Sequence, residues 1–265
     1  MKEYPPLKTR LETERMRLAA EGLERVIADI GSVIKPGLTT MDLEHVALLS
    51  LKRNGLDQAL KGYQGFPNAT CISVNNVAAH GIPGSYTLSE GDIFSFDISA
   101  TRDGWFADAA WTFGVGRISN AARRLIRTAW RSMLAGAAAA RAGRRMGDIG
   151  AAIVATAGAG GCRVVESCTG HGIGRELHEP PTVPHTGTQD GGVPIVPGMV
   201  LNIEPILTLG SGSVRRLDDG WSYVTADGEL AAQFEVTVAI GADSTRILTL
   251  GRHKELLSPL HPPYG

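Results

Sequence analysis

Five ionisable side chains interrupt stretches of this chain that are otherwise apolar or rich in glycine. The five residues are Asp97, Asp108, His171, Glu204 and Glu235. Burying an isolated ion costs several kcal/mol, so a fold accepts neighbouring buried carboxylates only if cations lie among them. The sequence therefore predicts a fold that gathers these side chains around bound metal ions.

A β-hairpin is predicted where the first two carboxylates lie. The stretches 93–101 and 105–113 have the composition of strands, and Asp103-Gly104 between them is typical of a two-residue hairpin turn. In that hairpin, residues whose numbers sum to 207 face each other across the two strands. The turn dipeptide thus fixes which side chains become neighbours.

This register makes Asp97 and Asp108 neighbours, because Asp108 then lies opposite Ser99. Side chains alternate between the two faces of a strand, so both carboxylates project from one face as diagonal neighbours. A pair of exposed strand carboxylates is the alternative interpretation. Apolar side chains indicate covered strands instead, and they are Phe94, Phe96, Ile98 and Phe106. A metal ion shared by the two carboxylates explains the pair better.

The second half of the chain supplies the remaining three side chains. Glu204 ends the alternating stretch 200–204 and Glu235 lies in the alternating stretch 233–238, so each strand directs one carboxylate to a polar interior. His171 lies between glycines, which let the backbone pass close to a ligand. One imidazole with four carboxylates suits Mn, Fe(II), Co or Zn and lacks the ligands of a structural zinc site.

In its ordered motifs the chain resembles the type I methionine aminopeptidases, which have the pita-bread metallopeptidase fold. The resemblance runs from about Lys8 to about Leu250, nearly the whole chain. The motifs that carry it are GYQGFPNATCISVNNVAAHGIP, DGWFADAAWTF, CTGHGIGRELHEPP, PGMVLNIEP, and DGW followed by AAQFEVT. The resemblance implies removal of the initiator methionine from nascent polypeptides.

The resemblance also implies roles for individual residues. It makes the five ionisable side chains ligands of two divalent metal ions, and it makes His80 and His178 catalytic histidines. The positions that line the methionine side-chain pocket in the family correspond to Tyr63, Phe66, Cys71, Leu177 and Trp221. The remaining histidines receive no role, and they are His45, His185, His253 and His261.

The expected chemistry is hydrolysis of the first peptide bond by metal-activated hydroxide. Two metal ions roughly 3.5 to 4 Å apart can share a water and lower its pKa from about 15.7 toward 7. We expect Glu204 to act as the proton shuttle to the leaving amine. One metal ion and His178 would stabilise the oxyanion, and His80 could contact the substrate backbone.

The chain departs from the family pattern near the expected site without losing a ligand. Leu177 replaces a usual aromatic residue, Ile206 a usual methionine, and Val236 a common histidine. Ala109 and Ala110 follow Asp108 where hydroxyl residues are common. The departures bear on pocket shape and catalytic efficiency, and they leave open a specialised second copy of the enzyme.

Two alternatives stay open. A proline-specific relative, an Xaa-Pro peptidase or prolidase, would keep the five ligands but usually carries a large additional N-terminal domain, whereas the first motif here begins at Gly62. A non-catalytic binding relative would be expected to have lost ligands. The physiological metal, the tolerated residue after methionine and the oligomeric state are not fixed by the sequence.

Composition sets the expected surroundings. A net charge of −1 gives no reason to expect binding to DNA or membranes. Three cysteines without CxxC spacing favour a reducing cytosol, and the charged N-terminus lacks the apolar segment of a signal peptide. We therefore expect a cytoplasmic monomer with one catalytic domain, residues 1–265, in which 1–10 and 251–265 are tails.

The pattern of elements predicts an α+β fold with two similar halves around a curved antiparallel sheet. Predicted helices cover 11–34, 39–54, 119–142 and 147–157, and further strands cover 163–166, 200–204, 222–225, 229–237 and 245–250. Arg124, Arg127 and Arg131 lie on one face of the third helix. Transient ribosome contact is one interpretation of these arginines, but a solvated helix face is favoured.

Overall fold

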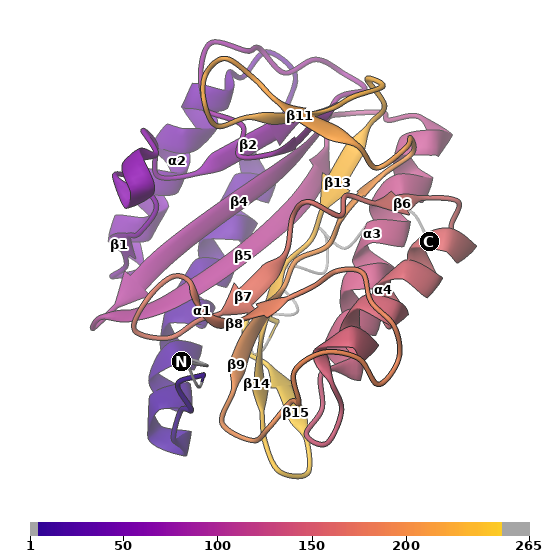
Figure 1. The fold of residues 1–265 in the computed structure, drawn as a ribbon. Helices are drawn as coiled ribbons and strands as arrows, with labels where there is room; N and C mark the ends of the chain where they lie inside the picture. The colour runs from indigo at the N-terminus through magenta and orange to yellow at the C-terminus, as the bar shows by residue number, and fades with distance from the viewer. Residues whose placement is uncertain (1–4, 251–265) are drawn as a thin grey trace.

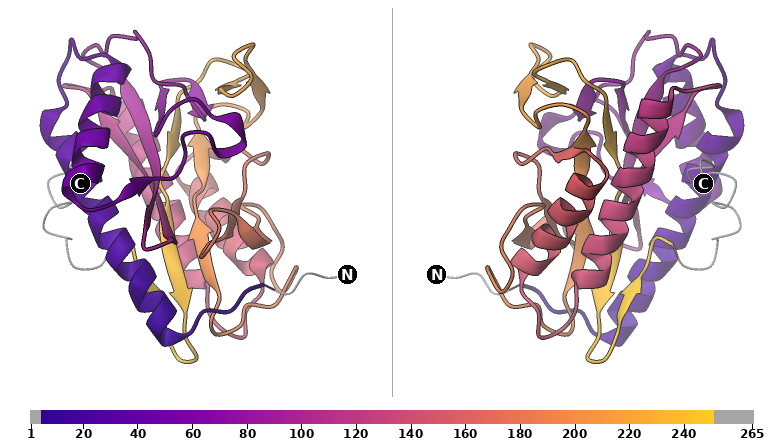
Figure 2. Two further views of the ribbon diagram at one scale, coloured as in Figure 1. Left: turned by 90° about the vertical axis from the view of Figure 1, so that its left-hand side faces the viewer. Right: turned by 90° about the vertical axis from the view of Figure 1, so that its right-hand side faces the viewer.

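The computed structural model describes residues 5–250. Within that range, no helix combines the length and the apolar character that crossing a membrane requires. The α-helices of the described range form two pairs, which lie on the outside of the strands (Figures 1 and 2). Their bounds are α1 (Arg10–Val33), α2 (Thr40–Arg53), α3 (Asn120–Ala139) and α4 (Met146–Ala159).

Antiparallel strands, most of them short, and one 3-10 turn make up the rest of the regular structure in residues 5–250. In the first half these are β1 (Asp57–Gln58), η1 (Tyr63–Gly65), β2 (Cys71–Val74), β3 (Val77–Ala79), β4 (Ile93–Arg102) and β5 (Trp105–Gly114). In the second half they are β6 (Arg163–Val164), β7 (Gly170–Gly172), β8 (Glu179–Val183), β9 (Val200–Ile203), β10 (Ile206–Thr208), β11 (Val214–Arg216), β12 (Tyr223–Thr225), β13 (Ala231–Gln233), β14 (Val236–Ile240) and β15 (Thr245–Ile247).

Local sequence signals set the helix boundaries. Thr9 and Glu12 form a capping box at the start of α1, and Thr39 and Asp42 form one at the start of α2. Each box satisfies backbone N–H groups that have no partner inside the helix. The four predicted helices are confirmed, with small shifts at their ends.

The hairpin of β4 and β5 has the predicted register, with Ser99 opposite Asp108. Asp103 and Gly104 in the turn have φ values of 53° and 70°, the left-handed conformation that a type I′ turn needs at both central positions. β4 also pairs with β1 and β2, so Cys71 lies opposite Asp97. β4 is thus the central strand of a four-stranded sheet, and within the described residues β5 pairs with it alone.

The second half contributes a five-stranded antiparallel sheet in the order β15, β14, β9, β7, β8. Two three-stranded sheets, β13–β10–β6 and β11–β12–β3, complete the strands (Figure 1). α1 packs on β4 and β5, and α3 packs on β10 and β13. The apolar faces of the strands are therefore covered by helices, as the α+β prediction expected.

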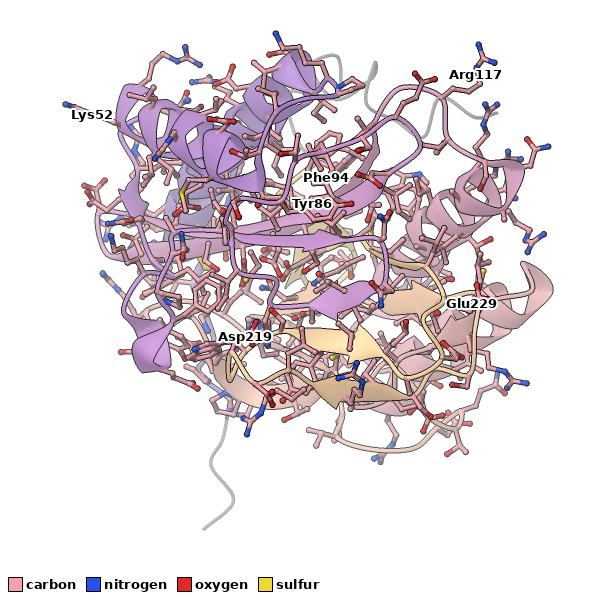
Figure 3. All side chains as sticks on the ribbon, turned by 90° about the horizontal axis from the view of Figure 1, so that it is seen from above. Lys52, Tyr86, Phe94, Arg117, Asp219 and Glu229 are labelled. Carbon is pink, nitrogen blue, oxygen red and sulfur yellow. The ribbon has the colours of Figure 1, made fainter. Side chains whose placement is uncertain are left out.

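The buried core continues from the helices into the sheets. Phe94 on β4 is completely buried and lies inside the molecule in Figure 3, where Lys52 and Arg117 point outward. Trp111 on β5, Trp130 on α3 and Phe234 form an aromatic cluster with ring centroids 4.9 to 5.4 Å apart. This cluster joins the hairpin of the first half to the second half.

One predicted strand is wrong. The stretch 229–237 was expected to be continuous, but it splits into β13 and β14, which belong to different sheets. Between them the N–H of Glu235 donates to the carbonyl of Ala110 on β5, at 3.0 Å. This contact with β5, which is distant in the sequence, therefore interrupts the ladder of backbone hydrogen bonds where β13 ends and β14 begins. The predicted tail 251–265 lies outside the described residues.

Candidate metal centre

All five ionisable side chains predicted as ligands come to one region on the inner face of the strands. Asp97 lies on β4, Asp108 on β5 and His171 on β7, while Glu204 directly follows β9 and Glu235 directly precedes β14. Beside them lies a cavity of about 550 Å³. Its walls include Asp97, His171, Glu204, His80, His178, Cys168, Thr182, Glu179, Tyr223 and Gln233.

The tightest group contains Asp108, His171 and Glu235. One ligand atom from each of these residues lies within 4.8 Å of the other two. The Nε2 atom of His171 lies 3.7 Å from Oδ2 of Asp108 and 3.4 Å from Oε1 of Glu204. Asp97 faces the same cavity, and its Oδ2 accepts a hydrogen bond from Nε2 of Gln233 at 3.4 Å.

The imidazole of His171 is held in the orientation that a metal ligand needs. Its Nδ1 donates to the carbonyl of Gly172 at 2.9 Å, which leaves the lone pair of Nε2 directed at the carboxylates. Burial and the nearby His178 lower the pKa of His171 to about 4. The ring is therefore neutral at physiological pH and does not neutralise the acidic groups around it.

The carboxyl groups resist ionisation in the absence of cations. Burial raises the pKa of Asp97 to about 7. Burial, reinforced by the neighbouring carboxylates, also raises the pKa of Asp108, Glu204 and Glu235 well above the usual range. Within the described part of the chain, no hydrogen bond reaches Oε1 of Glu204 or Oε1 of Glu235. This donor set fits divalent metal ions, which would supply the missing positive charge.

Residues that the sequence reasoning left without a role support the ligands. Ser99 donates its hydroxyl to Oδ1 of Asp108 at 2.8 Å, and Nδ2 of Asn202 lies 3.4 Å from Oδ2 of the same residue. Thr237 donates to Oδ1 of Asn202 at 2.8 Å. Ser99, Asn202 and Thr237 each lie two positions from an acidic residue, so the period-two pattern could have identified them.

His185 is a further buried residue beside the site, although no sequence motif indicates a role for it. It is 1% exposed, and its Nε2 accepts a hydrogen bond from the backbone N–H of Glu204 at 3.4 Å. Burial lowers its pKa to about 3, so it is a neutral support for that turn. His45 is exposed, whereas His253 and His261 lie outside the described residues.

The two histidines with expected catalytic roles both line the cavity. His80 follows β3 with a φ of 54°, and burial lowers its pKa. The ring of His178 lies edge-on to that of His171, with centroids 4.1 Å apart. The Tyr63 hydroxyl lies 2.7 Å from Nδ1 of His178. Burial and the nearby His80 lower the pKa of His178.

The residues expected in the methionine pocket do not line this cavity. Phe66 and Trp221 pack edge to face, with ring centroids 5.2 Å apart. Cys71 is buried beside Asp97, its partner on the neighbouring strand, and burial raises the pKa of its thiol. Leu177 is 1% exposed and packs in the main hydrophobic core. Of the five, the structure brings Tyr63 directly to a catalytic candidate.

Comparison with known proteins agrees with this geometry. The family sequence model of metallopeptidase family M24 matches residues 14–242 of this chain. The chain is 44% identical over 244 residues to the methionine aminopeptidase of Clostridium perfringens, covering 92% of this chain and 98% of the relative.

Solved structures give the same result. The methionine aminopeptidase of Rickettsia prowazekii superposes with a TM-score of 0.91 at 33% identity, covering 93% of this chain and 100% of its own. The methionine aminopeptidase of Thermotoga maritima superposes with a TM-score of 0.91 at 37% identity, covering 93% of this chain and 99% of its own. The chain belongs to metallopeptidase family M24. Within that family its place is among the methionine aminopeptidases, and the predicted pita-bread fold is confirmed.

Proposed function

We propose that this chain acts as one catalytic domain that removes the initiator methionine from nascent polypeptides with two divalent metal ions. One observation carries the proposal. Four buried or partly buried carboxyl groups with raised pKa values lie in one region with a neutral imidazole, an arrangement that bound cations would stabilise. The proposed ligands are Asp97, Asp108, His171, Glu204 and Glu235.

The geometry suggests how the ligands divide between the ions. Asp108, His171 and Glu235 converge, and Glu204 adjoins His171, so this group would hold one ion. Asp97 would hold the second ion together with the carboxylates of Asp108 and Glu235. When bound, the ions supply Lewis acidity and lower the pKa of water in the site.

Glu204 is the proposed proton carrier. Its buried Oε1 has no hydrogen-bond partner within the described residues, so it is free to take a proton from water and deliver it to the leaving amine. Its backbone N–H is held by His185, which limits movement of the turn.

His178 is the proposed hydrogen-bond donor to the substrate carbonyl. If the Tyr63 hydroxyl donates to Nδ1, the proton of the neutral ring is on Nε2, which can then donate to developing negative charge. His80, which directly follows β3 and lines the same cavity, would contact the substrate backbone. The methionine side chain would be held by Tyr63, Phe66, Cys71, Leu177 and Trp221, where aromatic edges favour a thioether.

Peptide hydrolysis by metal-stripped protein tests the proposal. The protein is titrated with Mn, Fe(II), Co or Zn and supplied with Met-Ala-Ser, Leu-Ala-Ser and Ala-Pro peptides. Met-Ala-Ser should be cleaved fastest, and activity should reach its maximum as the second ion binds. Faster cleavage of Leu-Ala-Ser would contradict methionine selection, and faster cleavage of Ala-Pro would support a proline-specific enzyme instead.

The proposed setting is a cytoplasmic monomer acting on chains as they emerge from the ribosome. The preference for Met over Leu is expected to amount to about 1 to 3 kcal/mol, because the two side chains differ little in volume. The titration also ranks the candidate metals, since activity per bound ion is measured for each.

A further inference from the structure

The loop from Gly174 to Glu179 carries His178 into the cavity, and both of its sides are held. On one side the backbone N–H of Phe106 donates to the carbonyl of Gly174 at 3.0 Å. On that side, too, the guanidinium of Arg175 lies 4.0 Å from the centroid of the Trp105 ring. These contacts fix the loop to the β4–β5 hairpin.

Glu179 holds the loop from the other side. Its Oε1 accepts hydrogen bonds from the backbone N–H groups of Arg175 at 2.8 Å and Glu176 at 3.3 Å. Its Oε2 accepts from the ammonium of Lys8. One carboxylate therefore fastens the backbone on the N-terminal side of His178, while Glu179 itself begins β8 and pairs with Gly172.

Lys8 reaches this carboxylate from the segment before α1. Its backbone N–H donates to the carbonyl of Gly198 at 2.7 Å, and its ammonium also donates to the carbonyl of Pro6 at 2.9 Å. A Cβ atom on Gly174 would lie only 2.3 Å from Cε of Lys8, so the glycine leaves the space through which the lysine passes.

The ion pair of Lys8 and Glu179 is buried and does not lie on the surface. The Lys8 and Glu179 side chains are 5% and 7% exposed. Charges buried to this degree are tolerated only when they are paired and hydrogen-bonded, and each partner here has additional backbone contacts. Glu179 also lines the cavity beside His178.

We propose that the Lys8–Glu179 ion pair positions His178, so that the segment before α1 is part of the active-site framework. Glu179 and Lys8 are positioning residues that act through the loop and not by contact with substrate. This inference rests on the role proposed above for His178. It predicts that the ion pair controls turnover more than substrate affinity.

The experiment compares Glu179→Gln, Lys8→Met and the Lys8→Met/Glu179→Gln double variant in the metal-loaded enzyme. Arg17→Met is the matched control, because Arg17 is also largely buried and pairs with Glu14 and Glu21 on α1. The double variant removes both charges, so it keeps the test open if one lone buried charge prevents folding. Turnover of Met-Ala-Ser, metal content and the imidazole NMR signals of His178 are measured.

We expect kcat to fall roughly tenfold to a hundredfold in the ion-pair variants, because small displacements of a positioned group have effects of this size. KM should change less than about threefold, and metal content and the Arg17→Met enzyme should be unchanged. The His178 signals should shift. Adding Glu179→Gln to His178→Ala should lower kcat no further, because the two changes act through one group.

Unchanged His178 signals in the ion-pair variants would overturn the positioning role. So would a loss of kcat that persists fully in the His178→Ala background, because Glu179 would then act directly. A normal kcat in His178→Ala alone would overturn the proposed role of His178 instead. The NMR signals would still show whether the ion pair positions the ring.

Discussion

At the scale of single residues, the site combines groups that oppose one another in the absence of cations. The Nδ1 atom of His171 is engaged by Gly172, so its only free nitrogen faces Asp108 and Glu204. Protonating this nitrogen would supply a counter-charge, but burial lowers its pKa to about 4. This imidazole therefore does not supply the positive charge that the carboxyl groups would need once ionised.

The ligands can be tested one at a time. Asp97→Ala and Glu204→Ala should each lower the activity of the metal-supplemented enzyme by at least about 10³, because a ligand and, at Glu204, the proton carrier are lost. The rate of Met-Ala-Ser cleavage is measured beside the bound metal per chain and the circular dichroism spectrum. Near-normal turnover of either folded variant would contradict the two-ion proposal.

His178 should behave differently, because its proposed role is donation and not metal binding. His178→Ala is expected to lower kcat by roughly 10² to 10³, the range for one lost oxyanion donor, with the metal content unchanged. Tyr63→Phe is the companion variant, because it removes the hydroxyl beside Nδ1 while keeping the ring. Loss of an ion in His178→Ala would make this residue a ligand.

At the scale of elements, α2 holds the loop that leads into β2. Oε1 of Glu44 accepts hydrogen bonds from Nδ2 of Asn68 at 3.3 Å and from the N–H of Ala69 at 2.8 Å, and Oε2 accepts from the Thr70 hydroxyl. Glu44 is 4% exposed, and Ala69 and Thr70 are completely buried. This loop precedes Cys71, which pairs with Asp97 in the sheet.

Glu44→Ala should therefore lower the free energy of unfolding by about 2 to 4 kcal/mol, because buried donors lose their acceptor. Glu44→Gln keeps one carbonyl acceptor and should lower it less. Glu229→Ala serves as the control, since Glu229 is exposed and surface substitutions usually change stability by less than about 0.5 kcal/mol. Urea unfolding measures all three, and equal midpoints for Glu44→Ala and Glu229→Ala would exclude this role.

Elements set by neighbouring residues were predictable, and elements set by distant contacts were not. The β4–β5 register followed from Asp103-Gly104 alone. β8 was missed because Pro180 and Pro181 are unfavourable in a strand, although a strand at the edge of its sheet tolerates them. The break before β14 depends on Ala110, far away in the sequence, so no local pattern indicates it.

The same division applies to the site. The proposed ligands stand out in the sequence because each is an acidic or imidazole group inside an apolar or glycine-rich stretch. The Lys8–Glu179 contact joins residues 171 positions apart, and neither residue stands out locally. The pocket role of Leu177 stays a prediction, since its side chain packs in the hydrophobic core and does not line the described cavity.

At the scale of the whole molecule, the candidate metal centre lies where the two halves meet. Asp97 and Asp108 come from the hairpin of the first half, and His171, Glu204 and Glu235 come from the second. Bound ions would therefore link the halves, while the aromatic cluster of Trp111, Trp130 and Phe234 links them from the helix side. Metal binding and global stability should thus be coupled.

This coupling gives a pH dependence whose sign can be worked out for the metal-free protein. A carboxyl group with a raised pKa holds its proton when folded and releases it when unfolded, so its contribution to stability falls as pH rises toward the folded-state pKa. The lowered pKa of His171 acts in the opposite direction, but only up to its unfolded value near 6.5. Above that pH, among the proposed metal ligands, only the carboxyl groups change the free energy of unfolding with pH.

We therefore expect the metal-free protein to lose stability between about pH 6.5 and 8, by about 1.4 kcal/mol per pH unit for each proton held only in the folded state. Added metal should reverse the trend, because ligands bind ions more tightly once deprotonated, and an ion at a hundred times its Kd adds about 2.7 kcal/mol. Urea unfolding with EDTA or with Co measures both slopes. The double variant Asp108→Asn/Glu235→Gln should make the unfolding free energy depend less on pH with and without metal, because two carboxyl groups with raised pKa values are gone. If the stability of the metal-free protein does not change with pH in this window, the carboxyl groups are already ionised in the folded state, and the expectation is wrong.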